Sequence, residues 1–481
     1  MNQRIGRAIE ELRLRVNDGN GSVLRLPLWA MTAYGRLGMQ AAWVVAPMGV
    51  GVALRLGTNI VLARLLAPEI FGLMLVVNML RTGTELLSDI GIGQSVVRSK
   101  REPDHAFLDT AFTIQLLRGA VLTLVMVALA YPLALLYGSE FEEILLTVSV
   151  IFLITGLQSP ALFLMQRNMQ LRPRAALEVI VTVFQCSTTI GLAFFFPTVW
   201  ALVWGLLLST AFGTALSYFV GDRRIPRLRL HRDHLREIVH FGKWIFFATL
   251  IYFAASSTDR AFFGAMLPMA AVGIYSVART FSDMVGLLAQ RLGAFLVFPK
   301  IANLRSQDRV VAARVKQARR HTLTLVALGL GTAIAGADAF ILVCYDARYH
   351  AAAFMLPVLL FGAWFGVLAI FAEALLLGCD RPAPGAFANG GKFVTLAVGL
   401  PLALTSAGMF GGLLVLALAE VVRWLILSRA LLKEKMAFFG DDVVLTVLLV
   451  IVAVVVKLAL SAIGVVPDFA DWWAMGAGIH G

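Results

Sequence analysis

The chain has 481 residues, of which 59% are hydrophobic and only 15% are charged, and its mean hydropathy is +0.83. Soluble domains carry roughly 25% charged residues, so these values exclude an ordinary soluble protein and indicate a polytopic membrane protein. The formal charge of +12 does not indicate nucleic-acid binding, because no soluble module is present on which a basic face could form. Nucleic acid is therefore not an expected partner.

Residues 1–42 precede the first long apolar run. Within residues 1–22, isoleucine, leucine and valine recur at helical spacing, and most arginines lie on the other side. This pattern is typical of an amphipathic helix on an anionic membrane face, although a solvated tail is the competing interpretation. The apolar run that follows ends without a small-residue cleavage pattern, so we expect a retained anchor rather than a signal peptide.

Thirteen apolar runs are long enough to cross a bilayer, which requires about 20 mostly apolar residues. The predicted fold is an all-α polytopic membrane protein, with two pseudo-symmetric six-helix bundles around a central cavity plus a thirteenth transmembrane helix. The expected spans cover approximately residues 43–66, 71–92, 108–130, 142–165, 175–196, 199–220, 243–264, 271–298, 322–344, 353–378, 387–406, 409–432 and 442–464.

The connections between these spans predict the orientation of the chain. Most of the 41 Lys and Arg residues fall in every second connection, whereas the alternate connections contain only Arg348. Because basic loops stay in the cytoplasm, we expect a multi-pass protein of the cell (inner) membrane, with the N-terminus cytoplasmic and the C-terminus periplasmic or outside.

Two similar halves are expected from the direction of the spans. The first and seventh spans run the same way, which is typical of a parallel repeat about an axis along the membrane normal. Pro68 to Gly72, before the second span, also resembles Pro268 to Gly273 before the eighth. The expected division is 1–42 (cytoplasmic amphipathic segment), 43–220 (N-terminal six-helix bundle), 221–242 (cytoplasmic basic linker), 243–432 (C-terminal six-helix bundle) and 433–481 (additional transmembrane helix and outer tail).

Charged residues inside the spans are the candidate functional groups. An ionisable side chain at membrane depth costs at least ~2.5 kcal/mol unless it faces a partner or a wet cavity. In the second span Arg81, Glu85 and Asp89 follow at intervals of four and share one stripe of the helix. In the eighth span Arg279 and Asp283 have the same spacing and are expected to pair.

An unpaired surplus of arginine at membrane depth would select an anion, and guanidinium groups bind phosphate oxygens in pairs. A transporter also needs carboxylates that sense a proton or Na⁺. The alternative is that each charge belongs to a salt bridge that docks helices. The candidates for substrate binding are Arg55, Arg81, Arg118, Arg260, Arg279 and Arg291, and those for ion coupling are Glu85, Asp89, Asp259 and Asp283.

No site for a metal, a cofactor or catalysis is expected. The three cysteines, Cys186, Cys344 and Cys379, lie in or beside apolar runs without paired spacing, so neither a disulfide framework nor a metal site is indicated. The sequence also lacks a Gly-rich loop followed by Lys and Ser or Thr, which makes ATP hydrolysis by this chain an unfavoured hypothesis.

Five stretches of the chain form a recognisable pattern: Leu62–Leu73, Ser88–Ile92, Val97-Arg98, Asp259-Arg260 and Val272–Arg279. This pattern resembles that of the bacterial polysaccharide/O-antigen flippases of the multidrug/oligosaccharidyl-lipid/polysaccharide exporter superfamily. The resemblance extends from about Trp43 to Lys435. A long N-terminal lead and the thirteenth helix depart from the family pattern of twelve or fourteen spans.

The resemblance implies a V-shaped pair of bundles that alternates access. Such a protein is not an enzyme, and moves an undecaprenyl-diphosphate-linked oligosaccharide to the outer leaflet for polysaccharide or lipopolysaccharide biosynthesis. Its implied partners are this lipid-linked substrate, membrane lipids, and polysaccharide polymerase and chain-length proteins. The alternatives are a multidrug or cation antiporter or a lipid II flippase of the same superfamily, and a membrane glycan polymerase or ligase, for which the outer connections are short.

Overall fold

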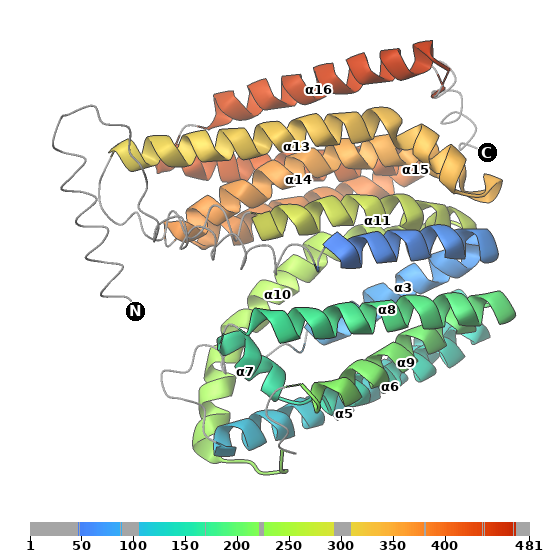
Figure 1. Ribbon diagram of the computed structural model, residues 1–481, viewed down its shortest axis with the longest axis vertical. Helices are drawn as coiled ribbons and strands as arrows, with labels where there is room; N and C mark the ends of the chain where they lie inside the picture. Colours follow the sequence, from blue (N-terminus) through green and yellow to red (C-terminus); the bar gives the residue numbers. More distant parts are fainter. Residues whose placement is uncertain are drawn as a thin grey trace.

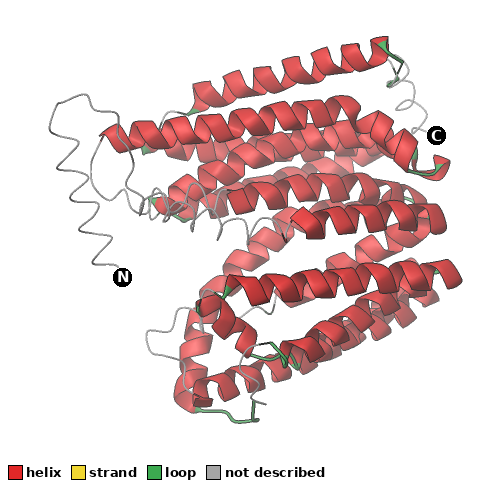
Figure 2. Cartoon of the chain, in the orientation of Figure 1, coloured by secondary structure: helices red, strands yellow, loops and turns green. Residues whose placement is uncertain are grey.

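The structure is a computed structural model that describes residues 47–467 apart from 48, 87, 89–104, 169, 221–225, 293–308, 380, 435, 437 and 465. In these ranges the chain forms helices and no strands (Figures 1 and 2). A helix over residues 49–65 comes first. It is followed by α3 (Pro68–Leu86), α5 (His105–Tyr137), α6 (Ser139–Gly156), α7 (Ala161–Arg167), α8 (Leu171–Phe195), α9 (Val199–Ser217), α10 (Arg232–Met266), α11 (Met269–Leu292), α13 (Arg309–Cys344), the short 3-10 helix η2 (Ala347–Tyr349), α14 (Ala352–Gly378), α15 (Ala383–Lys433) and α16 (Phe439–Ala462).

The helices confirm the all-α membrane fold that the apolar runs predict. In the described ranges seven helices are individually long and apolar enough to cross a membrane, or eight if the bent pair of α6 and α7 is one span. The 51-residue α15 covers two expected spans, 387–406 and 409–432. The boundary between them is a break in the helical backbone at Ala407 and Gly408, where Gly408 has φ 56° and ψ −149°. Charged residues lower the hydropathy of α3, α10 and α11, which are not among the seven.

Two groups of helices lie on either side of a central layer (Figure 1). Helices α5, α6, α8 and α9 pack together in one group, and α13, α14, α15 and α16 form the other. Between them lie α3, α10 and α11. Helix α3 packs against α5, α6 and α9 of one group but more extensively against α10 and α11, which in turn pack against α15 and α14 of the other group. Helix α3 thus links the first group to the rest of the central layer, and the division of the chain at 221–242 stays a prediction.

The two similar turns of the sequence meet each other in the central layer. A Cβ atom on Gly72 of α3 would lie 2.1 Å from the carbonyl oxygen of Met269, and one on Gly273 of α11 would lie 1.8 Å from that of Pro68. Real side chains do not approach so closely. The glycines therefore permit a reciprocal contact in which the start of each helix rests on the turn before the other.

The end of the 49–65 helix is tied to the connection between α13 and α14. Phe71 also packs edge-on against Tyr349, with ring centroids 5.7 Å apart. The hydrogen bonds run from the Tyr345 hydroxyl to Asn59 Oδ1 (2.8 Å), from the Tyr349 hydroxyl to the Leu66 carbonyl (3.0 Å) and from the Arg64 guanidinium to the Cys344 carbonyl (3.1 Å). We call this set the turn contacts; they join the first half of the chain to the second.

The additional helix α16 packs on α13 through three ion pairs, of which Lys316–Asp441 is the most exposed one. Lys457 pairs with Asp338, and both are buried. Arg319 binds Asp442 through two hydrogen bonds of 2.7 and 3.1 Å, and the Trp424 indole donates to the same carboxylate at 3.0 Å. Lys457 thus has a structural partner in the helix on which α16 packs.

Some sequence predictions lie outside the described residues. These are the amphipathic segment 1–42, the candidate coupling residue Asp89, the first part of the linker 221–242, and the tail beyond residue 467. They stay predictions.

Candidate functional site

A cavity of about 300 Å³ lies among α3, α10, α11, α14 and α15. Its polar and charged side chains come mainly from α10, α11 and α15, whereas α3 contributes Thr82 and Leu86. Gly362 and Gly366 of α14 also line the cavity, and a Cβ atom on them would lie 3.1 Å from Ala417 Cα and 3.4 Å from Glu420 Oε2, respectively. The polar and charged lining consists of Thr82, Tyr252, Ser256, Ser257, Arg260, Arg279, Ser282, Asp283, Gln290, Asn389, Lys392, Glu420 and Arg423.

One wall of the cavity carries a carboxylate shared between two arginines. Asp283 Oδ2 lies 2.5 Å from a terminal nitrogen of Arg260, on α10, and its Oδ1 lies 3.0 Å from Arg279 Nε. The predicted pairing of Arg279 with Asp283 within α11 is therefore confirmed. The bond to Arg260 joins α11 to α10 and was not visible as a spacing in the sequence.

A second carboxylate lies behind this wall. Asp259 is only 1% exposed. It accepts a hydrogen bond of 2.5 Å from the hydroxyl of the fully buried Tyr275, and Arg279 Nε lies 3.5 Å away. Asp259 does not line the cavity; it anchors the base of Arg279.

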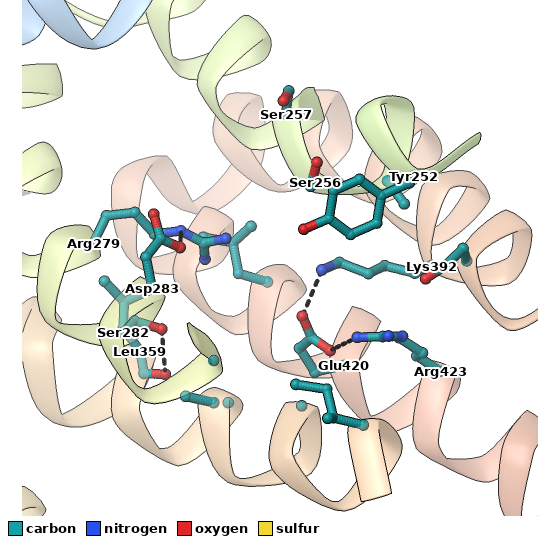
Figure 3. A pocket seen from close by; sticks show the side chains of 18 of the residues that line it. Tyr252, Ser256, Ser257, Arg279, Ser282, Asp283, Leu359, Lys392, Glu420 and Arg423 are labelled. Carbon is teal, nitrogen blue, oxygen red and sulfur yellow. Dashed lines mark hydrogen bonds and ion pairs between the residues drawn. The ribbon is translucent and has the colours of Figure 1, made fainter. Parts of the chain in front are cut away.

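The opposite wall repeats this arrangement with residues of α15 and α14. Glu420 lies between Lys392, at 2.5 Å, and Arg423, at 3.7 Å. Arg423 also binds Glu373 at 2.8 Å. Figure 3 shows Arg279 and Asp283 facing this second group across the cavity.

Lys392 is a functional candidate that the sequence reasoning missed. It lies inside the expected span 387–406 and is 9% exposed. The signal was present, because a lysine within an apolar span needs a partner or a wet cavity. Its partner Glu420 is 28 residues away, however, and no helical spacing connects them.

The two walls are balanced in charge. The predicted unpaired surplus of arginine is wrong here, because the four cations have four carboxylates as neighbours. The network is nevertheless short of hydrogen bonds, and buried polar groups without partners are costly. The unpartnered buried atoms are Nε of Arg260, Arg279 and Arg423, Oδ1 of Asp259 and Oε2 of Glu420. The N–H groups among them can donate hydrogen bonds to water or ligand oxygens, and the carboxylate oxygens can accept hydrogen bonds.

The candidates of the first half lie outside the cavity lining. Arg81 forms an ion pair with Glu85 along α3, at 3.5 Å. Arg118 of α5 donates to Ser88 Oγ at 2.9 Å and to the Glu85 carbonyl at 2.5 Å. Both arginines therefore have partners, contrary to the expectation that they are unpaired.

Arg55, inside the 49–65 helix, and Arg291, at the end of α11, are both exposed and do not line the cavity either. The structure thus brings Arg260, Arg279 and Asp283 together in one cavity wall, with Asp259 behind them. In the described part of the chain no cluster of three or more His, Cys, Asp or Glu residues could hold a metal ion.

Apolar helices of membrane length around a charged internal cavity define a polytopic membrane protein. Residues 61–353 match the family described as polysaccharide biosynthesis protein, and the chain belongs to this family. The lipopolysaccharide biosynthesis protein WzxC of Escherichia coli (strain K12) is 22% identical over 268 residues, which are 55% of this chain and 54% of WzxC. The chain therefore spans about half the length of this curated relative.

Solved structures confirm the fold. The lipid II flippase MurJ in an inward closed conformation has a TM-score of 0.69 at 12% identity, over 87% of this chain and 98% of MurJ. A multidrug resistance MATE family transporter in an inward-facing conformation has a TM-score of 0.58 at 12% identity, over 85% and 98%. The eukaryotic MATE transporter AtDTX14 has a TM-score of 0.57 at 13% identity, over 86% and 99%. The chain is therefore a multi-pass membrane protein of the polysaccharide biosynthesis protein family, with the fold of these solved structures.

Proposed function

We propose that this protein moves an undecaprenyl-diphosphate-linked oligosaccharide from the inner to the outer leaflet of the inner membrane by alternating access. The observation that carries the proposal is the cavity wall of Arg260 and Arg279, enclosed among membrane-length helices of a chain in a polysaccharide biosynthesis family. Paired guanidinium groups suit the oxygens of a diphosphate. A lipid-linked substrate also requires a site that lies within the membrane.

Neutral polar groups beside the arginines suit a sugar. Ser256 and Ser257 of α10, Asn389 of α15 and Gln290 of α11 all line the cavity. Hydroxyl and amide groups can both donate and accept hydrogen bonds, as sugar hydroxyls require. The charged wall would thus hold the diphosphate, and these side chains would contact the first sugar of the glycan.

The position of the cavity along the helices supports an inward-open step. The residues of α11 that line the cavity begin at Arg279 and end at Gln290. They therefore lie progressively farther from the α10–α11 turn, and from the end of the molecule at which the turn contacts lie. With the N-terminus in the cytoplasm, that end is the outer one. The cavity would then be accessible to substrate from the cytoplasmic leaflet while the outer end is closed.

The remaining candidates belong to other steps of the proposed cycle. We propose that Arg55, Arg81, Arg118 and Arg291 contact the substrate when the bundles are arranged differently. Glu85, Asp89, Asp259 and Asp283 are the proposed coupling groups for a proton or Na⁺. In the cell, a polysaccharide polymerase and chain-length proteins are the proposed partners after translocation.

Transport in vesicles tests this proposal. The purified chain would be reconstituted with a fluorescent undecaprenyl-diphosphate oligosaccharide, and translocation followed by quenching from the outside. Because a hydrogen bond to a charged group contributes about 1.5–3 kcal/mol, Arg279→Gln should weaken substrate binding roughly 10- to 100-fold. Arg174→Gln, in an exposed pair on α8, is the matched control and should transport normally.

The same vesicles separate the alternatives. Transport of lipid II in place of the oligosaccharide lipid would support a lipid II flippase. Movement of a cationic drug against a proton gradient, without lipid translocation, would support an antiporter. Lengthening of the glycan by the purified chain would indicate a polymerase or ligase. Equal oligosaccharide translocation by wild type and Arg279→Gln would reject the site assignment.

A further inference from the structure

Asp283 occupies the position that an anionic substrate group would need. Each of its two oxygens faces a different arginine, Oδ2 at 2.5 Å from Arg260 and Oδ1 at 3.0 Å from Arg279. A phosphate that bridges two guanidinium groups uses the same arrangement, with one oxygen for each. The carboxylate therefore fills an anion site that the protein itself supplies.

The exposure of Asp283 distinguishes it from the other carboxylates of the network. Its side chain is 44% exposed, whereas those of Arg260 and Arg279 are 21% and 16% exposed. Asp259 has a side-chain exposure of 2% and Glu420 of 17%. An anion entering the cavity would thus meet Asp283 before any other acid of this network.

The two arginines differ in the partners that remain when Asp283 moves away. Arg279 keeps Asp259 as a neighbour at 3.5 Å. For Arg260, Asp283 is the one carboxylate within ion-pair distance in the described part of the chain, so its charge becomes free when Asp283 moves. The buried Nε atom of Arg260 already lacks a hydrogen-bond partner and can donate to an additional acceptor oxygen.

We propose that Asp283 is a built-in competitor that binds Arg260 and Arg279 in the empty protein and is displaced by the anionic group of the substrate. The identity of that group as a diphosphate rests on the proposed function. Two consequences follow. The carboxylate lowers the affinity for the anion, since the anion must replace it. It also speeds release, because Asp283 returns to the arginines as the anion leaves.

Binding of inorganic pyrophosphate to the full chain in nanodiscs tests the competitor directly. Asp283→Asn removes the competing charge and keeps the size of the side chain, so pyrophosphate should bind several-fold more tightly. Asp283→Glu keeps the charge and should bind close to wild type. Adding Arg260→Gln to Asp283→Asn should abolish the gain. Glu178→Gln, which alters the Arg174–Glu178 pair on α8, is the matched control and should bind as wild type.

Translocation of the fluorescent lipid supplies the second readout. Asp283→Asn should hold undecaprenyl diphosphate more tightly but turn over several-fold more slowly than wild type. Unchanged or weaker pyrophosphate binding in Asp283→Asn, with a thermal unfolding midpoint like that of wild type, would overturn the inference. A further outcome is that Asp283→Asn binds pyrophosphate more tightly than wild type while neither protein binds or moves the lipid. That result would support Asp283 as a competitor and reject the proposed function.

Discussion

The charged side chains of the cavity show which contacts a sequence can predict. The Arg279–Asp283 pair follows from a spacing of four on one helix, and the structure confirms it. The bonds of Arg260 to Asp283 and of Lys392 to Glu420 join different helices. Only the packing of α10, α11 and α15 creates these neighbours. The sequence therefore predicted which charges lie in the membrane, but not their partners.

Replacing Lys392 tests how strongly one such partner is needed. Lys392→Met leaves Glu420, whose side chain is 17% exposed, with Arg423 at 3.7 Å as its remaining neighbour. Breaking a buried ion pair costs about 3–5 kcal/mol, so the variant should unfold at a clearly lower temperature in detergent. Lys392→Met with Glu420→Gln should recover part of the loss. Lys316→Met, in a pair whose lysine is 49% exposed, is the control and should lose at most about 1 kcal/mol.

At the level of helices, the strongest constraint is the contact between the starts of α3 and α11. The sequence shows two similar turns, and in the structure each turn packs against the start of the helix that follows the other turn. The repeat could be read from Pro68 to Gly72 and Pro268 to Gly273. That the two copies touch required the fold, since α3 lies between the two groups of helices.

Gly273→Ala tests this contact. Its Cβ atom would lie 1.8 Å from the Pro68 carbonyl oxygen. Because neither atom can move away by a side-chain rotation, the two helices must separate. We expect a loss of about 1–3 kcal/mol, as for overpacking elsewhere, seen as a lower unfolding midpoint. Gly286→Ala on the same helix meets nothing within 4 Å and should instead stabilise by up to ~1 kcal/mol. Equal midpoints for the two variants would contradict the importance of the contact.

In the whole molecule, the number and order of the helices were predictable, whereas their grouping was not. Long apolar runs and breaks at Pro and Gly define each helix locally, even at Ala407 and Gly408 inside α15. The assignment of α3 to one bundle depends on side chains that contact it from both sides. Phe71 belongs to the core around α11 and α14, whereas Val77 belongs to the core around α5, α6 and α9.

The turn contacts make a prediction about the whole molecule. Alternating access requires the two halves to separate at each end in turn, so the end held by Asn59 and Tyr345 must open during transport. Asn59→Cys with Tyr345→Cys, in a chain whose native cysteines are replaced by alanine, can be bridged by a reducible bifunctional thiol reagent. The bridge should stop lipid translocation in vesicles, and reduction should restore it.

A bridge within one group of helices is the control for this experiment. Lys316→Cys with Asp441→Cys joins α13 to α16, whose side chains form an ion pair of 3.0 Å. Because both helices belong to the same group, they need not separate, and translocation should continue after bridging. Transport at the wild-type rate by fully bridged Asn59→Cys/Tyr345→Cys protein would show that the turn contacts persist throughout the cycle, and the halves would then have to move about that end rather than part there.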